Sequence, residues 1–184
     1  MRLFVAVSLP EEVRAMLAVL ANGLPGARWV DSDNLHLTLR FLGELDAGDA
    51  ADVDAAFSHV RAPAFDMSIA GLGHFGEGRK PRALWVGVAA NPALDHLHER
   101  IERALVRAGL PPEGRKFTPH ITLARFKSNP GARLPAYLAE HSLVRAGPFP
   151  VADFKLYSSF LSAQGAIHQV EASYPLEPRG AVQD

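Results

Sequence analysis

Two short segments of this 184-residue chain resemble each other closely and lie almost half a chain length apart. Residues 34–41 read Asn-Leu-His-Leu-Thr-Leu-Arg-Phe, and residues 119–126 read Pro-His-Ile-Thr-Leu-Ala-Arg-Phe. Both alternate apolar and polar side chains, which is typical of a strand with one face in a core. A repeat at this separation favours a fold of two related lobes.

The composition limits the class of protein. With 48% hydrophobic residues, the chain can bury one substantial core, and we expect residues 1–184 to form a single domain of two interleaved lobes. The absence of cysteine excludes disulfides, thiolate nucleophiles and iron–sulfur clusters. No apolar run approaches the roughly 18 residues of a membrane span, and no cationic leader opens the chain. We therefore expect a cytoplasmic monomer without a membrane partner.

Helical and strand-like patterns are interleaved along the chain. We predict helices over residues 10–21, 46–60, 92–108 and 135–141, and strands over residues 2–8, 35–42, 65–70, 83–88, 120–126, 154–160 and 167–172. Several strands follow one another too closely for crossover helices between them. The patterns therefore predict an α+β fold with mainly antiparallel sheets.

Positive charge is concentrated in one part of a chain whose formal net charge is only −1. No acidic residue occurs between Glu113 and Glu140. The basic residues of this segment are Arg115, Lys116, Arg125, Lys127 and Arg133. Such asymmetry suits a face that attracts an anion, although a solvated basic loop has the same pattern. The near-neutral total argues against a protein that coats nucleic acid.

The repeated segments supply the candidate site. The sequence contains three threonines, and two of them, Thr38 and Thr122, follow a histidine by two positions. We call residues 36–39 and 120–123 the tetrads. Residues i and i+2 of a strand share a face, so His36 lies beside Thr38 and His120 beside Thr122, while the apolar neighbours point to the core. Two such strands could bring two imidazoles and two hydroxyls together.

This set of groups suits cleavage of a cyclic phosphodiester. One histidine can take a proton from attacking water while the other protonates the departing ribose oxygen, because histidine titrates near pH 6.5. The threonine hydroxyls can donate to phosphate oxygens, and Arg125 is the best candidate to balance charge on phosphorus. Two alternatives stay open: histidines with a purely structural role, and a His-bound metal, which the lack of HExxH and of a tight His/Asp/Glu cluster disfavours.

Further segments support a resemblance to a known family. They are residues 2–7, 36–43 and 81–88, and the Phe-Thr-Pro at 117–119 that leads into His120. With the two tetrads, they make the chain resemble the two-histidine (2H) phosphoesterase superfamily, in its RNA 2′,3′-cyclic phosphodiesterase (2′-5′ RNA ligase) branch. The resemblance covers almost the whole chain.

The resemblance implies a bilobal fold with both tetrads facing a central cleft, and hydrolysis of a 2′,3′-cyclic phosphate to a 2′-phosphate without cofactor or metal. The substrate would be an RNA end or a small nucleotide, with reversible 2′-5′ RNA ligation as a related activity. His36 would protonate the leaving 3′ oxygen and His120 would activate water, while Thr38, Thr122 and Arg125 would hold the phosphate. The alternative is a module that binds RNA ends or cyclic nucleotides without turnover, which gives no reason for two histidines.

Other features are expected to have structural roles. Residues 71–76 match GxGxxG, but a strand rather than a helix follows, so we interpret these glycines as a turn. We assign Trp29, Phe41 and Phe126 to the core rather than to stacking on a nucleobase. The remaining histidines lack a patterned partner and are assigned to the surface or the core: His59, His74, His96, His98, His141 and His168.

Overall fold

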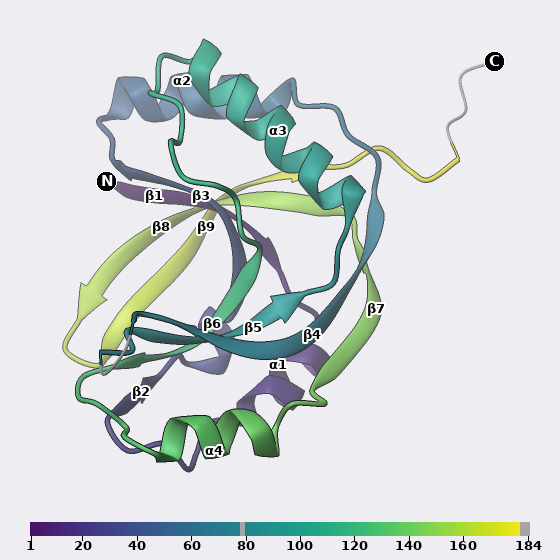
Figure 1. The fold of residues 1–184 in the computed structure, drawn as a ribbon. Coiled ribbons are helices and arrows are strands. Elements are labelled where there is room, and N and C mark those ends of the chain that lie inside the picture. Colours follow the sequence, from purple (N-terminus) through teal and green to yellow (C-terminus); the bar gives the residue numbers. More distant parts are fainter. Residues whose placement is uncertain (78–79, 181–184) are drawn as a thin grey trace.

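The computed structural model describes residues 1–77 and 80–180, which form two sheets flanked by helices (Figure 1). The helices are α1 (Glu11–Ala18), α2 (Ala47–Ser58), α3 (Pro92–Arg107) and α4 (Arg133–Glu140), with a 3-10 helix at Ser32–Asn34. The strands are β1 (Arg2–Ser8), β2 (Ala27–Trp29), β3 (His36–Glu44), β4 (Phe65–Phe75), β5 (Ala83–Val88), β6 (His120–Phe126), β7 (Arg145–Val151), β8 (Asp153–Ser162) and β9 (Gly165–Pro175). None of the helices in the described residues is long and apolar enough to cross a membrane.

The two repeated segments lie in different sheets. One sheet has the strand order β3-β1-β8-β9, and the other has the order β2-β6-β5-β4-β7. Neighbouring strands of both sheets run antiparallel. In Figure 1, α2 and α3 lie together at one end of the molecule, and α1 and α4 lie at the other. The predicted α+β fold with two lobes and antiparallel sheets is confirmed.

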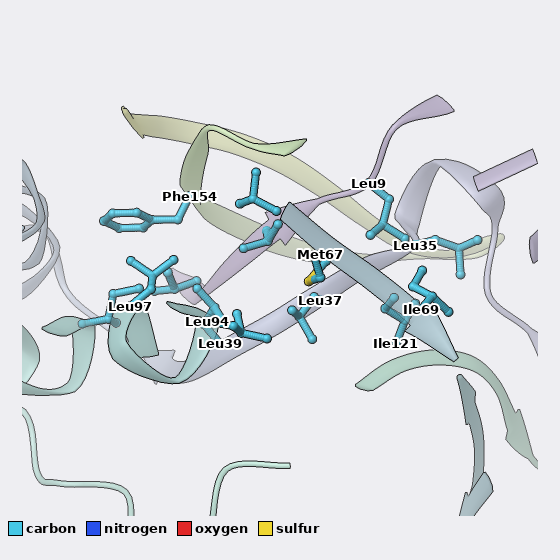
Figure 2. Packing of buried hydrophobic residues seen from close by; sticks show 14 of the residues in the cluster. Leu9, Leu35, Leu37, Leu39, Met67, Ile69, Leu94, Leu97, Ile121 and Phe154 are labelled. Atoms are coloured by element: carbon cyan, nitrogen blue, oxygen red, sulfur yellow. The ribbon is translucent and has the colours of Figure 1, made fainter. Parts of the chain in front are cut away.

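The apolar members of both tetrads point into one shared core. Leu37 and Leu39 of β3 and Ile121 of β6 are at most 4% exposed. Figure 2 shows them in one cluster with Met67 and Ile69 of β4. Each such buried side chain contributes about 1.5–3 kcal/mol, which holds both strands in register. Because side chains alternate along a strand, the histidines and threonines are left on the opposite face.

Helix α3 ties the core to the first tetrad strand. The side chain of Asn91 caps the helix by accepting a hydrogen bond from the Leu94 amide at 3.1 Å, and Pro92 occupies the first turn. Its buried residues recur every three or four positions, which makes one face apolar. The carboxylate of Glu102 on α3 accepts two hydrogen bonds from Arg40 of β3, at 2.5 and 2.7 Å.

The sequence patterns missed two strands for different reasons. Strand β2 has three residues, which is too short to show a period. Strand β7 contains Pro148 and Pro150, which normally argue against a strand. It lies at the edge of the five-stranded sheet, where a residue without an N–H can face outward.

The turn that we predicted at residues 71–76 is wrong for most of its length. Strand β4 continues through Gly71 and Gly73 to Phe75. Gly73 lies opposite Trp85 of β5, and a Cβ atom at Gly73 would clash with the indole ring. The missing side chain therefore gives the Trp85 ring room to lie against β4. Only Gly76, with φ of +100°, follows the end of the strand.

Candidate active site

The two tetrad strands lie against each other where the sheets meet. Cα atoms of β3 approach those of β6 within 8 Å. His36, Thr38, His120 and Thr122 are all half-buried, and the residues between them are buried. The four polar side chains lie on the side of the two strands away from the shared core, which we call the tetrad face. The structure thus brings both predicted histidine–threonine pairs to one region.

A bulge in β6 brings Arg125 onto the tetrad face. Strict alternation would place Arg125 on the opposite side from Thr122, because three positions separate them. The register, however, shifts from Trp85–Thr122 to Leu84–Ala124. The extra residue in β6 reverses the alternation from that point. Arg125 therefore shares its face with Thr122, as a phosphate-binding role requires.

Strand β3 has the same bulge at the same place in its tetrad. Its register shifts from Ala6–Thr38 to Val5–Arg40, so Phe41 is the counterpart of Arg125. Phe41 is 59% exposed, and its ring centroid lies 6.0 Å from that of Phe4. Its assignment to the core is therefore wrong. The two strands present an aromatic ring and a guanidinium at equivalent positions.

Both histidines are anchored through the same ring nitrogen. The Nδ1 atom of His36 lies 2.6 Å from the carbonyl oxygen of Asn34, and that of His120 lies 2.6 Å from the carbonyl oxygen of Thr118. A carbonyl oxygen only accepts, so each Nδ1 carries a proton. In each neutral ring, the Nε2 atom then holds the lone pair. The Thr38 hydroxyl oxygen lies 3.0 Å from the Nε2 atom of His36. This arrangement directs both reactive nitrogens away from the anchoring carbonyls.

His36 is neutral in the free protein. Burial lowers its pKa to about 4, against the opposing effect of the Asn34 carbonyl, and the positive charge of Arg125, together with that of His168 when protonated, lowers it further. Its ring stacks on that of Phe4 with centroids 4.8 Å apart. Because the charge of Arg125 affects the pKa of His36, Arg125 on the second tetrad strand lies within electrostatic range of the first histidine.

His120 is flanked by two aromatic rings of its own five-stranded sheet. Its centroid lies 4.7 Å from that of Phe75 in an edge-to-face contact and 6.2 Å from that of Trp85. It pairs in register with Gly87 of β5. The strand neighbour thus carries no side chain beside the imidazole, while the two aromatic rings limit its rotation.

The basic segment contributes less free charge than its composition predicts. Arg115 pairs with Glu113 at 3.2 Å, and Arg133 pairs with Glu140 at 2.8 Å. Arg125 is exposed and takes part in none of the ion pairs among residues 1–77 and 80–180. Carboxylates thus offset Arg115 and Arg133, while Arg125 shares its lack of an ion pair among the described residues with Lys116 and Lys127.

Comparison with known proteins agrees with this geometry. The family model for the 2′-5′ RNA ligase superfamily matches residues 10–159, a range that includes both tetrads. This chain belongs to the 2′-5′ RNA ligase superfamily. An RNA 2′,3′-cyclic phosphodiesterase of Aeropyrum pernix is 36% identical over 157 residues, covering 83% of this chain and 87% of that protein. One of Thermotoga maritima is 34% identical over 181 residues, covering 92% of each chain.

Two solved structures have the same fold. The TT0787 protein of Thermus thermophilus superimposes with a TM-score of 0.79 at 30% identity, covering 97% of this chain and 100% of that one. E. coli LigT complexed with 3′-AMP superimposes with a TM-score of 0.78 at 28% identity, covering 95% of this chain and 97% of that one. The resemblance inferred from the tetrads is confirmed.

A cavity beside His36 contains residues that the sequence did not single out. It measures about 340 Å³, and its lining includes Lys155, Tyr157 and His168. The Nδ1 atom of His168 is buried and has no hydrogen-bond partner among the described residues. Only the hairpin register, which sets His168 opposite Ser159, brings it near the first tetrad. No local pattern in the sequence could have found it.

A larger cavity lies outside the tetrad region. It measures about 450 Å³ and lies between α2 and α3, with Arg100, Arg103 and Arg107 in its lining. It contains no tetrad residue. The candidate site is therefore the tetrad face with the smaller cavity beside it.

Proposed function

We propose that this chain hydrolyses the 2′,3′-cyclic phosphate at the end of an RNA and leaves a 2′-phosphate, with His36 as acid and His120 as base. One observation carries the proposal: two imidazoles on adjoining strands are each held through Nδ1, 2.6 Å from a backbone carbonyl oxygen. Both Nε2 atoms are thereby oriented for proton transfer. The name shared by the Aeropyrum and Thermotoga relatives supports the substrate class.

In the proposed reaction, water attacks phosphorus on the side opposite the ribose 3′ oxygen. The Nε2 atom of His120 accepts a proton from water as the new P–O bond forms. The bond from phosphorus to the 3′ oxygen breaks, and His36 donates its Nε2 proton to that oxygen. One water is consumed, and the phosphate remains on the 2′ oxygen as a monoester. The family resemblance, rather than the geometry, supports this order of acid and base.

His36 must carry a second proton when the substrate is bound, although burial keeps its pKa near 4 in the free protein. A phosphate anion within hydrogen-bond distance favours the charged imidazole and raises its pKa. Binding of the substrate would therefore favour protonation of His36, the proposed acid. The free protein stores His36 in its neutral form.

The tetrad threonines and Arg125 would hold the phosphate during this reaction. In the free protein the Thr38 hydroxyl lies 3.0 Å from the Nε2 atom of His36. We propose that this hydroxyl turns to a phosphate oxygen when substrate binds, with Thr122 in the equivalent role. Arg125 would balance charge that develops on the phosphate oxygens.

The product isomer tests the assignment of roles. Purified protein is incubated with the four nucleoside 2′,3′-cyclic phosphates and with short RNAs that end in the same group, and products are identified by phosphorus NMR. We expect the 2′-phosphate alone, because the placement of the acid decides which ribose oxygen leaves. An equal mixture, or mostly 3′-phosphate, would contradict the roles of His36 and His120.

Two related functions use the same groups. Reversible 2′-5′ RNA ligation would run the same proton transfers with a ribose hydroxyl in place of water, and the superfamily name favours testing it. A binding module without turnover would show saturable binding of the cyclic phosphate and no product in the assay above. The cytoplasmic location and the monomeric state stay predictions.

A further inference from the structure

Two arginines lie directly opposite each other at one edge of the five-stranded sheet. Arg28 of β2 is the register partner of Arg125 of β6. Opposite residues of antiparallel neighbours point to the same face, with Cβ atoms about 4.5–5.5 Å apart. Arg28 therefore joins Arg125 on the tetrad face. No local pattern in the sequence singled out Arg28.

The side chain of Arg28 reaches the other sheet. Its Nη2 atom lies 3.5 Å from the position that a Cβ atom would take at Gly165, the first residue of β9. Figure 1 shows the end of this hairpin beside β2. Because β8 and β9 belong to the sheet that carries β3, the guanidinium of Arg28 lies where the two sheets approach each other.

The register pairing of the two arginines places like charges on one face of the sheet. Both are exposed, and neither takes part in an ion pair among residues 1–77 and 80–180. Like charges directly opposite each other destabilise a sheet. A bound anion would offset this repulsion, and paired guanidiniums are well suited to phosphate. The arrangement therefore indicates an anion-binding function rather than a contribution to folding.

We propose that Arg28 binds the phosphodiester on the 5′ side of the terminal nucleotide while Arg125 holds the reacting cyclic phosphate, so that the site recognises an RNA end in preference to a mononucleotide. This inference rests on the proposed function. A 2′,3′-cyclic phosphate carries one negative charge, which Arg125 alone can balance. A second guanidinium, one strand spacing or about 5 Å farther along the sheet, matches a second anion. In an RNA end that anion is the next phosphodiester, and a nucleoside cyclic phosphate lacks it.

The test compares a nucleoside 2′,3′-cyclic phosphate with a dinucleotide that ends in the same group. The variants are Arg28→Ala and Arg28→Lys. The control is Arg145→Ala, which removes an exposed arginine from β7, the opposite edge strand of the same sheet. We expect the ratio of kcat/KM for dinucleotide over mononucleotide to fall about tenfold in Arg28→Ala, less in Arg28→Lys, and not in the control. For the dinucleotide, the dependence of log kcat/KM on log salt concentration should become shallower by about 0.7.

The possible outcomes separate this inference from the proposed function. An equal loss on both substrates in Arg28→Ala would assign Arg28 to the reacting phosphate and overturn the inference, and so would no loss on either. Thermal unfolding serves as a second readout, because loss of the repulsion should leave the Tm of Arg28→Ala at or above that of the wild type. A clear drop in Tm would contradict the repulsion argument. Failure of the wild type to turn over either substrate would instead overturn the proposed function.

Discussion

The imidazoles of His36 and His168 meet edge to face, with centroids 5.4 Å apart and planes inclined by 84°. The two rings come from β3 and β9, which are the two outer strands of the same sheet. Burial lowers the pKa of His168 as well as that of His36. The free protein therefore keeps two neighbouring histidines neutral, and this has consequences for stability and for catalysis.

The stability of the free protein should decrease as the pH is lowered, because of His36. Its pKa is about 4 in the folded state and ordinarily 6.5, so the unfolded chain binds more protons between these values. Above pH 6.5 His36 is neutral in both states and does not reduce the free energy of unfolding. As the pH falls toward 4, the free energy of unfolding decreases, because the unfolded chain binds a proton that the folded protein does not. Urea denaturation at several pH values should show a shallower dependence in His36→Gln, by up to about 1.4 kcal/mol per pH unit. Parallel curves for the two proteins would contradict the shifted pKa.

The tautomer of both tetrad histidines can be observed directly. At pH 7 we expect nitrogen-15 NMR to show His36 protonated at Nδ1 alone, because its partner there is a carbonyl oxygen at 2.6 Å. Addition of a nucleoside 2′-phosphate should raise the pKa of His36 through the added negative charge. A pKa that does not move in the complex would mean that His36 cannot serve as the acid.

Removal of either histidine should impair chemistry more than binding. We expect His36→Ala and His120→Ala each to lower kcat by a factor of about 10² to 10⁴, the usual range for loss of a general acid or base. The double variant should be far less impaired than the product of the single effects, because the two groups act as a unit. Steady-state kinetics with a nucleoside cyclic phosphate would measure this, and near-normal turnover in either single variant would exclude the assignment.

Turnover should survive exhaustive chelation, because proton transfer is assigned to imidazoles and charge balance to Arg125. Residues 1–77 and 80–180 contain no group of three or more His, Asp or Glu side chains placed to hold a metal ion. The measurement is kcat before and after treatment with EDTA, with a control in which zinc or manganese is added back. Loss of activity on chelation and recovery with metal would favour a metal site instead.

Loss of the Glu102 carboxylate should destabilise the fold. Arg40 is 8% exposed, and besides its bonds to Glu102 it donates to the Pro111 carbonyl oxygen at 2.7 Å. Glu102→Ala would leave this guanidinium buried without a counter-ion, which costs about 3–5 kcal/mol. Glu99→Ala is the matched control on the same helix, since the Glu99–Arg103 pair is about 60% exposed and should contribute less than about 1 kcal/mol. Urea denaturation that gave similar losses for both variants would refute this view of the pair.

The sequence by itself determined the local structure and the identity of the chemical groups. Apolar residues at every second position of the tetrads predicted strands that bury one face, and the helical pattern over residues 92–108 predicted α3. The coincidence of two His-x-Thr motifs in a chain with three threonines pointed to a pair of imidazoles working together. These signals are local, so they could be interpreted without knowing how the sheets are arranged.

Only the tertiary structure decided which residues share the site. Strict alternation puts Arg125 on the opposite face from Thr122, and the bulge that reverses this depends on pairing between β6 and β5. The place of His168 depends on the β8–β9 register, and that of Arg28 on a three-residue strand with no period of its own. The low pKa of His36 likewise comes mainly from burial. Register and burial arise from contacts between distant segments, and for that reason neither was visible in the local patterns of the sequence.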